Sequence, residues 1–201
     1  MDITKGTTTV ALVGKEGVVL AADKRASMGT AVAHKSAQKV FKISPFAGAT
    51  GAGSVGDIQN FVNLLKVESN LYRIKNNQEL TVKSLATLAS RILFGYRVYP
   101  YLALFIIGGY DKKPVAFSLD PFGGMNEDKF IATGSGMQIA HGVLEDQYRE
   151  DLSAEEMKKL AVRCIKAATQ RDVATGDGIS MAVITKDGYK ELTQKEIEEV
   201  L

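Results

Sequence analysis

The sequence has few of the features that stabilise secreted or membrane proteins. Cys164 is the single cysteine among 201 residues, so no disulfide can form within the chain and nothing points to secretion. The longest apolar run, Tyr99 to Gly108, is far too short to span a bilayer. The segment Met1–Gly6 is too short and too polar for a signal peptide. Because repeats, low-complexity segments and proline-rich linkers are also absent, we expect one cytoplasmic domain.

Charge and histidine content argue against further classes of function. The net charge of +2 is too small to indicate a nucleic-acid-binding protein. The two histidines, His34 and His141, belong to no serine-hydrolase motif, and no spacing of residues predicts a metal or a cofactor. A content of 45% hydrophobic and 24% charged residues is typical of a globular protein with a sizeable core.

The first apolar runs predict a β-hairpin that is covered on both sides. The runs Thr7–Val13 and Val18–Asp23 flank the turn Gly14–Gly17. Each face of this hairpin is expected to be apolar, one with Val10, Leu12, Val18 and Leu20 and the other with Ala11, Val13, Val19 and Ala21. A sheet that is apolar on both faces has other layers on both faces.

The remaining elements are expected in consecutive groups. We expect a loop over 24–35, strands over 39–43, 47–52, 102–110, 115–119, 130–133 and 181–184, and helices over 54–75, 80–95, 137–149, 153–168 and 194–201. Strands do not alternate one for one with helices, which disfavours a doubly wound parallel sheet. The order predicts an α+β fold, with two antiparallel sheets face to face and a helical layer outside each. The apolar stripe of the helix after Ser153 places Cys164 in the core, where a nucleophilic role is not expected.

Gly6 and the three threonines that follow it lie near two charged residues in the predicted fold. If the hairpin is centred on Lys15, Thr7 lies opposite Asp23 on the same face. Lys39 begins the next strand, so a hydroxyl, a carboxylate and an amine would converge at the edge of one sheet, near water. These residues alone also fit ordinary β-formers and surface charges, and on their own they favour that simpler interpretation.

An N-terminal threonine offers a specific chemistry for this trio. A threonine hydroxyl is a poor nucleophile until a base removes its proton. A free α-amino group, with a pKa of roughly 7.7–8.0, is such a base, but Thr7 gains one only if the Gly6–Thr7 bond is cut. Glycine at position 6 would let the backbone bend so that the hydroxyl reaches the preceding carbonyl. Lys39 would lower the pKa of neighbouring groups, and Asp23 would hold Lys39 in place.

Motifs along nearly the whole chain resemble one family. These are Gly6-Thr7-Thr8-Thr9-Val10, Ala21-Ala22-Asp23-Lys24-Arg25, Lys39-Val40-Phe41, Gly51-Ala52-Gly53-Ser54-Val55-Gly56-Asp57, Tyr99-Pro100-Tyr101, Asp120-Pro121-Phe122-Gly123-Gly124, Ala132-Thr133-Gly134-Ser135-Gly136 and Gln170-Arg171-Asp172. In this order and spacing they resemble the β subunits of proteasome core particles of the archaeal type. The peptidase of the bacterial two-component ATP-dependent protease shares the threonine, aspartate and lysine. It usually lacks the Asp-Pro-Phe-Gly-Gly turn and is shorter, so it ranks second.

The resemblance implies a fold, a maturation step and roles for particular residues. It implies the four-layer αββα sandwich of N-terminal nucleophile hydrolases, with residues 1–6 as a prosegment removed by self-cleavage and 7–201 as the catalytic domain. It implies Thr7 as the nucleophile beside Asp23 and Lys39. Further roles are implied for Ser135 and Asp172, near the terminal amine and its water, and for Gly53, as an oxyanion donor. Thr175 stands where the family more often has serine; it keeps the hydroxyl, but its methyl group restricts the rotamer.

The resemblance also implies a substrate pocket and partners. The matching pocket positions carry no charge, which predicts a preference for neutral or apolar side chains, and Gly51 would widen the pocket. These positions are Ala26, Ser27, Ala37, Gly51, Val55 and Gln59. The implied partners are other β subunits in a heptameric ring, α subunits, an ATPase ring and unfolded polypeptides, with no nucleic acid, membrane or cofactor. The exposed face of the helix after Ser54, with Lys66, Glu68 and Arg73, would meet neighbouring subunits. The alternative is a structural ring subunit that keeps its prosegment, and the complete trio favours the catalytic interpretation.

Overall fold

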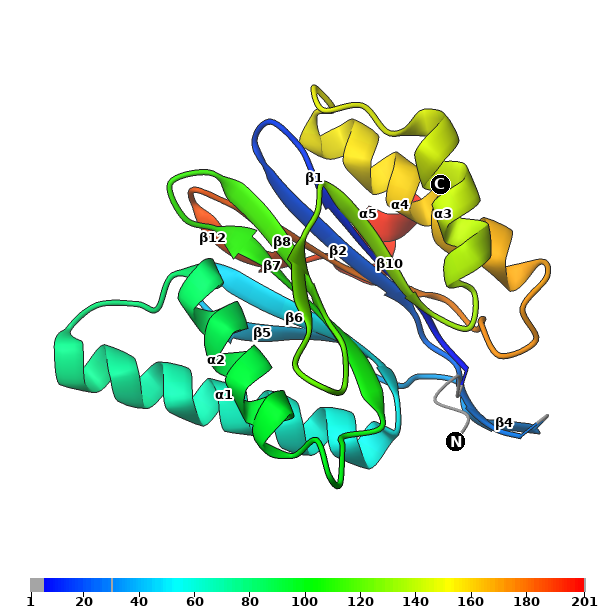
Figure 1. The fold of residues 1–201 in the computed structure, drawn as a ribbon. Coiled ribbons are helices and arrows are strands. Elements are labelled where there is room, and N and C mark those ends of the chain that lie inside the picture. Colours follow the sequence, from blue (N-terminus) through cyan, green and yellow to red (C-terminus); the bar gives the residue numbers. More distant parts are fainter. Residues whose placement is uncertain (1–5, 30, 201) are drawn as a thin grey trace.

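The computed structural model describes residues 6–29 and 31–200, which form two antiparallel sheets with helices against their outer faces (Figure 1). The first sheet has the strand order β10-β1-β2-β11-β12. Its strands are β1 (Thr8–Val13), β2 (Gly17–Asp23), β10 (Phe130–Gly134), β11 (Ile179–Thr185) and β12 (Gly188–Glu191). The α+β class predicted from the sequence is therefore confirmed.

The second sheet has the strand order β5-β6-β7-β8-β9. Its strands are β5 (Val40–Ser44), β6 (Ala47–Gly53), β7 (Ala103–Tyr110), β8 (Pro114–Leu119) and β9 (Met125–Glu127). A separate hairpin of β3 (Ala26–Met28) and β4 (Ala31–His34) lies beside the start of the described chain (Figure 1). Most of this hairpin is exposed, so it belongs to neither sheet's core.

The helices cover the outer face of each sheet, and a third apolar cluster lies between the sheets (Figure 1). Helices α1 (Val55–Asn76) and α2 (Val82–Gly95) pack on the second sheet through side chains such as Phe61 and Leu85. Helices α3 (Met137–Gln147), α4 (Ala154–Thr169) and α5 (Gln194–Glu198) pack on the first. Because both faces of each central strand are covered, the strand interiors are almost wholly apolar.

Local capping explains where two of the helices begin. Ser153 and Glu156 form a reciprocal capping box at the start of α4, as the sequence predicted. The side chain of Thr81 accepts a hydrogen bond from the Ser84 amide at the start of α2. Ser54 occupies the N-cap position of α1, although its side chain makes no capping hydrogen bond.

The register of the first hairpin differs by one residue from the prediction. Val13 pairs with Val18, so the turn is centred between Lys15 and Glu16 and not on Lys15. A shift of one residue moves every side chain of one strand to the other face. Consequently Val19 contacts the same helical layer as Val10 and Leu12, whereas the sequence analysis had grouped those two residues with Val18.

Several short strands were absent from the prediction. The segment 24–35 was expected to be a loop, but it contains β3 and β4. Strands β9 and β12 were also missed. Each of these strands has only three or four residues, too few to show an alternating apolar pattern. Within the described residues, no helix combines the length and apolar character needed to cross a membrane.

The position of Cys164 gives a chemical test of the core. Its side chain is buried in α4, and burial raises the pKa of Cys164 to about 12. Because the thiolate is the reactive form, we expect iodoacetamide at pH 9 to label the native chain at least ~100-fold more slowly than the urea-unfolded chain. Mass spectrometry measures both rates. Equal rates would show that Cys164 is not held in this core.

Candidate active site

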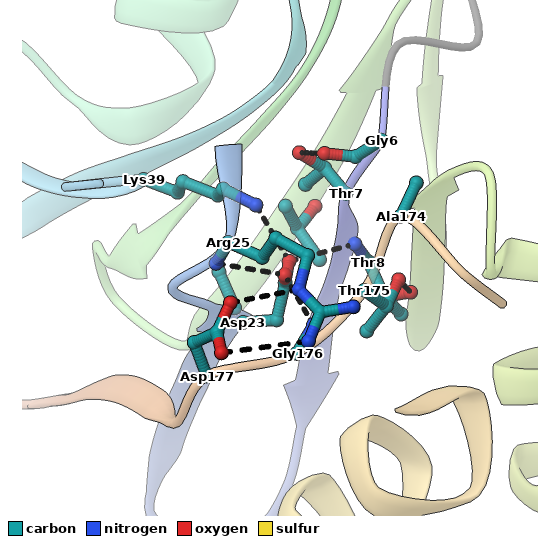
Figure 2. Close-up of polar contacts among 12 residues, drawn as sticks. Gly6, Thr7, Thr8, Asp23, Arg25, Lys39, Ala174, Thr175, Gly176 and Asp177 are labelled. Carbon is teal, nitrogen blue, oxygen red and sulfur yellow. Dashed lines mark hydrogen bonds and ion pairs between the residues drawn. The ribbon is translucent and has the colours of Figure 1, made fainter. Parts of the chain in front are cut away.

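Thr7, Asp23 and Lys39 meet where strands of the two sheets end (Figure 2). Thr7 immediately precedes β1, Asp23 is the last residue of β2 and Lys39 immediately precedes β5. The Lys39 ammonium lies 2.7 Å from the Asp23 carboxylate. The predicted convergence of hydroxyl, carboxylate and amine is therefore present, although Thr7 and Lys39 lie one residue before the strands that were expected to contain them.

Two details of the predicted geometry are wrong. The register of the hairpin places Thr8, not Thr7, level with Asp23, because Thr9 pairs with Ala22. The site also does not lie at the edge of one sheet near water. Strand β2 is the middle strand of its sheet, and Asp23 and Lys39 are 0% and 5% exposed.

The carboxylate of Asp23 accepts hydrogen bonds from four groups. Oδ1 accepts from Lys39 Nζ at 2.7 Å and from the Thr8 amide at 3.0 Å. Oδ2 accepts from the amides of Gly176 at 2.9 Å and Arg25 at 3.1 Å. Four donors on two oxygens satisfy a buried carboxylate, which offsets much of the cost of removing its charge from water.

Burial and pairing act in opposite directions on this ion pair. Burial raises the pKa of Asp23, while Lys39 and the amides of Thr8 and Gly176 act to lower it. Burial likewise lowers the pKa of Lys39, against the attraction of Asp23. For both groups burial outweighs the attraction between them, so each charged form is less favoured than it would be in water.

The Thr7 hydroxyl lies against the carbonyl of the residue before it. Thr7 Oγ1 donates a hydrogen bond to the Gly6 carbonyl oxygen (Figure 2). The Thr7 amide donates to Ser135 Oγ at 3.2 Å. Gly6 has a φ of +21°, and a Cβ there would lie only 2.6 Å from Ala174 Cβ. The chain therefore bends and packs here in a way that requires glycine. The rest of the predicted prosegment, residues 1–5, lies outside the described residues.

Ser135 and Thr175 are joined through Asp172. Both hydroxyls donate to Asp172 Oδ2 at 2.5 Å, and the Ala174 amide donates to Oδ1 at 3.1 Å. Ser135 follows β10, whereas Asp172 and Thr175 lie between α4 and β11. The threonine at position 175 thus makes the hydrogen bond that a serine hydroxyl could make there. These three residues, named from the family resemblance, are within one hydrogen-bonded group that reaches Thr7.

A cavity of about 170 Å³ opens beside Thr7. It is lined by all six predicted pocket residues, namely Ala26, Ser27, Ala37, Gly51, Val55 and Gln59. Gly53 also lines it, and its φ of +142° marks a backbone conformation that favours glycine. Among the described residues, no group of three or more His, Cys, Asp or Glu side chains could hold a metal.

The effect predicted for Gly51 needs correction. A Cβ at Gly51 would lie 2.7 Å from Ile58 Cγ2, so the space that glycine leaves is filled by Ile58 and does not simply widen the pocket. Ile58 also lines the cavity. Sequence analysis missed this lining role, because an apolar residue at helical spacing was assigned to the core alone.

Comparison with known proteins agrees with this combination of fold and site. A family model described as proteasome subunit matches residues 3–184. The chain belongs to the proteasome subunit family.

Archaeal β subunits are similar to this chain over nearly its whole length. Proteasome subunit beta 1 of Thermococcus onnurineus is 55% identical, over 98% of this chain and 97% of its own length. Proteasome subunit beta 2 of Pyrococcus furiosus is 52% identical, over 98% of this chain and 96% of its own length. Proteasome subunit beta of Methanocaldococcus jannaschii is also 52% identical, over 100% of this chain and 91% of its own length. The archaeal β-type resemblance predicted from the motifs is confirmed.

The burial of the ion pair predicts a larger loss of stability than a surface lysine would give. Removing Lys39 leaves Asp23 buried with three amide donors and no cation. We expect Lys39→Ala to lower the free energy of unfolding by about 3 kcal/mol, at the low end for a broken buried pair. Lys42→Ala removes an exposed cation on β5 that lies 5.8 Å from the centre of the Tyr189 ring, and it should change the free energy by less than ~1 kcal/mol. Urea unfolding of both variants measures the difference, and equal losses would contradict a buried pair.

Proposed function

We propose that this proteasome β-type chain is a threonine endopeptidase that matures by cutting its own Gly6–Thr7 bond. The observation that carries the proposal is the Thr7 hydroxyl on the Gly6 carbonyl, close to the buried Lys39–Asp23 pair. The fold assigned with this function is the four-layer αββα sandwich of N-terminal nucleophile hydrolases. Two sheets with helices outside each, and the site at one end between them, support that assignment.

Maturation begins with the hydroxyl already next to its target. Thr7 Oγ1 attacks the carbonyl carbon of Gly6, and the bond from that carbon to Thr7 N breaks. The hydroxyl proton passes to Thr7 N, so the products of this step are an ester on Thr7 and a free α-amine. Water then hydrolyses the ester, which releases Gly6 with a carboxylate and restores the hydroxyl.

The freed amine then supplies the base for cutting other chains. It accepts the proton of Thr7 Oγ1 as the oxygen attacks a substrate carbonyl, and it returns that proton to the departing amine. Lys39 stabilises the negative charge that develops at the oxygen. Asp23 fixes Lys39 through the 2.7 Å ion pair. Ser135 and Asp172 hold the terminal amine and the hydrolytic water, and the amide of Gly53 stabilises the oxyanion.

The cavity beside Thr7 receives the side chain before the cut bond. Its six predicted lining residues are uncharged, although Lys39 reaches the same cavity. A volume of about 170 Å³ suits a neutral side chain of medium size. Thr175 supports this site through its hydrogen bond to Asp172.

The partners follow from the family. We assign the chain to a heptameric ring of β subunits that stacks on α subunits, with unfolded polypeptides delivered by an ATPase ring. Large apolar side chains are exposed on the outer helices and the turn that follows them, which supports burial against neighbouring subunits. These include Val67, Leu71, Ile74, Phe94 and Tyr99.

Self-cleavage is testable by mass. After assembly with α subunits, the chain should lose Met1–Gly6 because the attacking hydroxyl and the carbonyl are already in contact. Lys39→Ala should keep those residues, whereas Lys42→Ala, which removes an exposed cation nearby, should lose them. Intact-mass spectrometry reads all three. A full-length wild-type chain in an active particle would rule out an N-terminal nucleophile, and a full-length chain in an inactive particle would favour a structural ring subunit.

The terminal-amine mechanism makes a separate prediction. In chains that begin at residue 7, Thr7→Ser should retain reduced peptidase activity and Thr7→Ala should have none, because only serine keeps the hydroxyl. Acetylating the amine of the wild-type chain should also abolish hydrolysis of a fluorogenic peptide, since the base is lost while the hydroxyl remains. Equal rates for blocked and free amines would identify a different base.

A further inference from the structure

Thr8, the residue after the proposed nucleophile, makes contacts that no proposed step has used. It is fully buried. Its amide donates to Asp23 Oδ1 at 3.0 Å, and its hydroxyl lies 2.7 Å from Thr175 Oγ1 (Figure 2). A Cβ on Gly136 would collide with the Thr8 hydroxyl, so a glycine at that position leaves the room that the hydroxyl occupies. Thr8 therefore joins the Asp23–Lys39 pair to the Asp172 group.

Counting protons fixes the direction of these hydrogen bonds. Thr175 and Ser135 each have one hydroxyl proton, and each donates it to Asp172 Oδ2 at 2.5 Å. The other acceptor near Ser135 Oγ, the Thr7 carbonyl oxygen, is farther away at 3.3 Å. The Thr8 hydroxyl must then donate to Thr175. Ser135, which has given its proton to Asp172, accepts from Thr7 N at 3.2 Å. Two hydroxyl chains thus end on one carboxylate, one from Thr8 through Thr175 and one from Thr7 N through Ser135.

We propose that Thr8 is a positioning residue for the terminal amine of Thr7, acting through Thr175, Asp172 and Ser135. This inference rests on the proposed function, because it concerns the base of that reaction. An oxygen that accepts a hydrogen bond becomes a better donor. Donation from Thr8 therefore strengthens the hold of Thr175 on Asp172 and leaves that carboxylate a weaker acceptor for Ser135.

Asp172 Oδ2 accepts hydrogen bonds from both Thr175 and Ser135, and loss of the Thr8 hydroxyl would weaken the one from Thr175 relative to the one from Ser135. Asp172 would then draw more strongly on the Ser135 hydroxyl, and the Ser135 oxygen would become a better acceptor for the Thr7 amine. A better acceptor stabilises the protonated amine, so the apparent pKa of the amine rises and less of the base is free near neutral pH.

Other charges around this site stay constant in the comparison. They come from β2 and the residues after it, from the segment before β5 and from the segment between α4 and β11. In the described part of the chain they include Asp23, Arg25, Lys35, Lys39, Asp172 and Asp177. Thr8→Val changes none of them and keeps the backbone amide that Asp23 accepts. A change in the amine can then be assigned to the hydroxyl.

The test uses assembled particles in which Thr7 is the first residue. Thr8→Val should lower kcat by up to about twofold at pH values below the amine pKa, the loss of free base that a pKa rise of ~0.3 units causes, with little change in KM. The acid limb of its pH–rate profile should move up by ~0.3 pH units. Thr8→Ser should restore both values. Thr9→Val is the matched control, because the buried Thr9 hydroxyl bonds Thr133 at 2.8 Å and Thr50 at 3.0 Å, away from Asp172.

A second measurement does not depend on peptidase activity. The pH dependence of acetylation of the Thr7 amine, followed by mass spectrometry, should show the same upward shift in Thr8→Val and none in Thr9→Val. The double variant of Thr8→Val and Thr175→Val should match Thr175→Val alone, since the two hydroxyls act in series. An unchanged amine pKa in Thr8→Val would overturn the positioning role. Equal shifts of the amine pKa in Thr8→Val and in the control Thr9→Val would overturn it as well. An inactive wild type would instead overturn the proposed function, while the acetylation shift would still decide the role of Thr8.

Discussion

The buried carboxylate of Asp23 is the interaction on which the candidate site depends. Its donors are the Thr8 amide at the start of β1, the Arg25 amide two residues after β2, the Lys39 ammonium just before β5 and the Gly176 amide before β11. A buried carboxylate with fewer donors would be costly, so each of these segments must reach its place for the site to be stable. One side chain therefore links the two sheets at the end where Thr7 lies. The geometry of the candidate site and the local stability therefore have the same physical origin.

The larger elements were predictable because their patterns are long. Helix α4 carries a capping box at Ser153 and an apolar stripe, and both are properties of consecutive residues. Strands β3, β4, β9 and β12 are too short for such a pattern, and their pairing depends on the rest of the fold. The register of β1 and β2 failed for a related reason. The sequence Gly14–Gly17 permits more than one turn, and packing against the second sheet selects between them.

Some features of the candidate site could be predicted from the residues alone, some only from the family resemblance, and some not at all. The charges of Asp23 and Lys39 and the threonines beside Gly6 could be connected from sequence, although their burial could not be. Ser135 and Asp172 lie far from Thr7 along the chain, and only the family resemblance brought them into the prediction. Ile58 gave no signal, because an apolar side chain on a helix is normally a core residue. Ile58 also lines the cavity, and this role becomes visible only in the structure, where Ile58 fills the space that Gly51 leaves without a side chain.

The three consecutive threonines illustrate how strand geometry separates roles. Successive side chains along a strand point to opposite faces. Thr7 lines the cavity between the ends of the sheets, and Thr9 lies between the sheets, bonded to Thr50 of the second one. Thr8 points the other way, toward Thr175 and the helical side. The same residue type thus supplies a proposed nucleophile, a contact to the Asp172 group and a link between sheets. Their identical appearance in the sequence hides this difference, because it arises from alternation and from what each face meets.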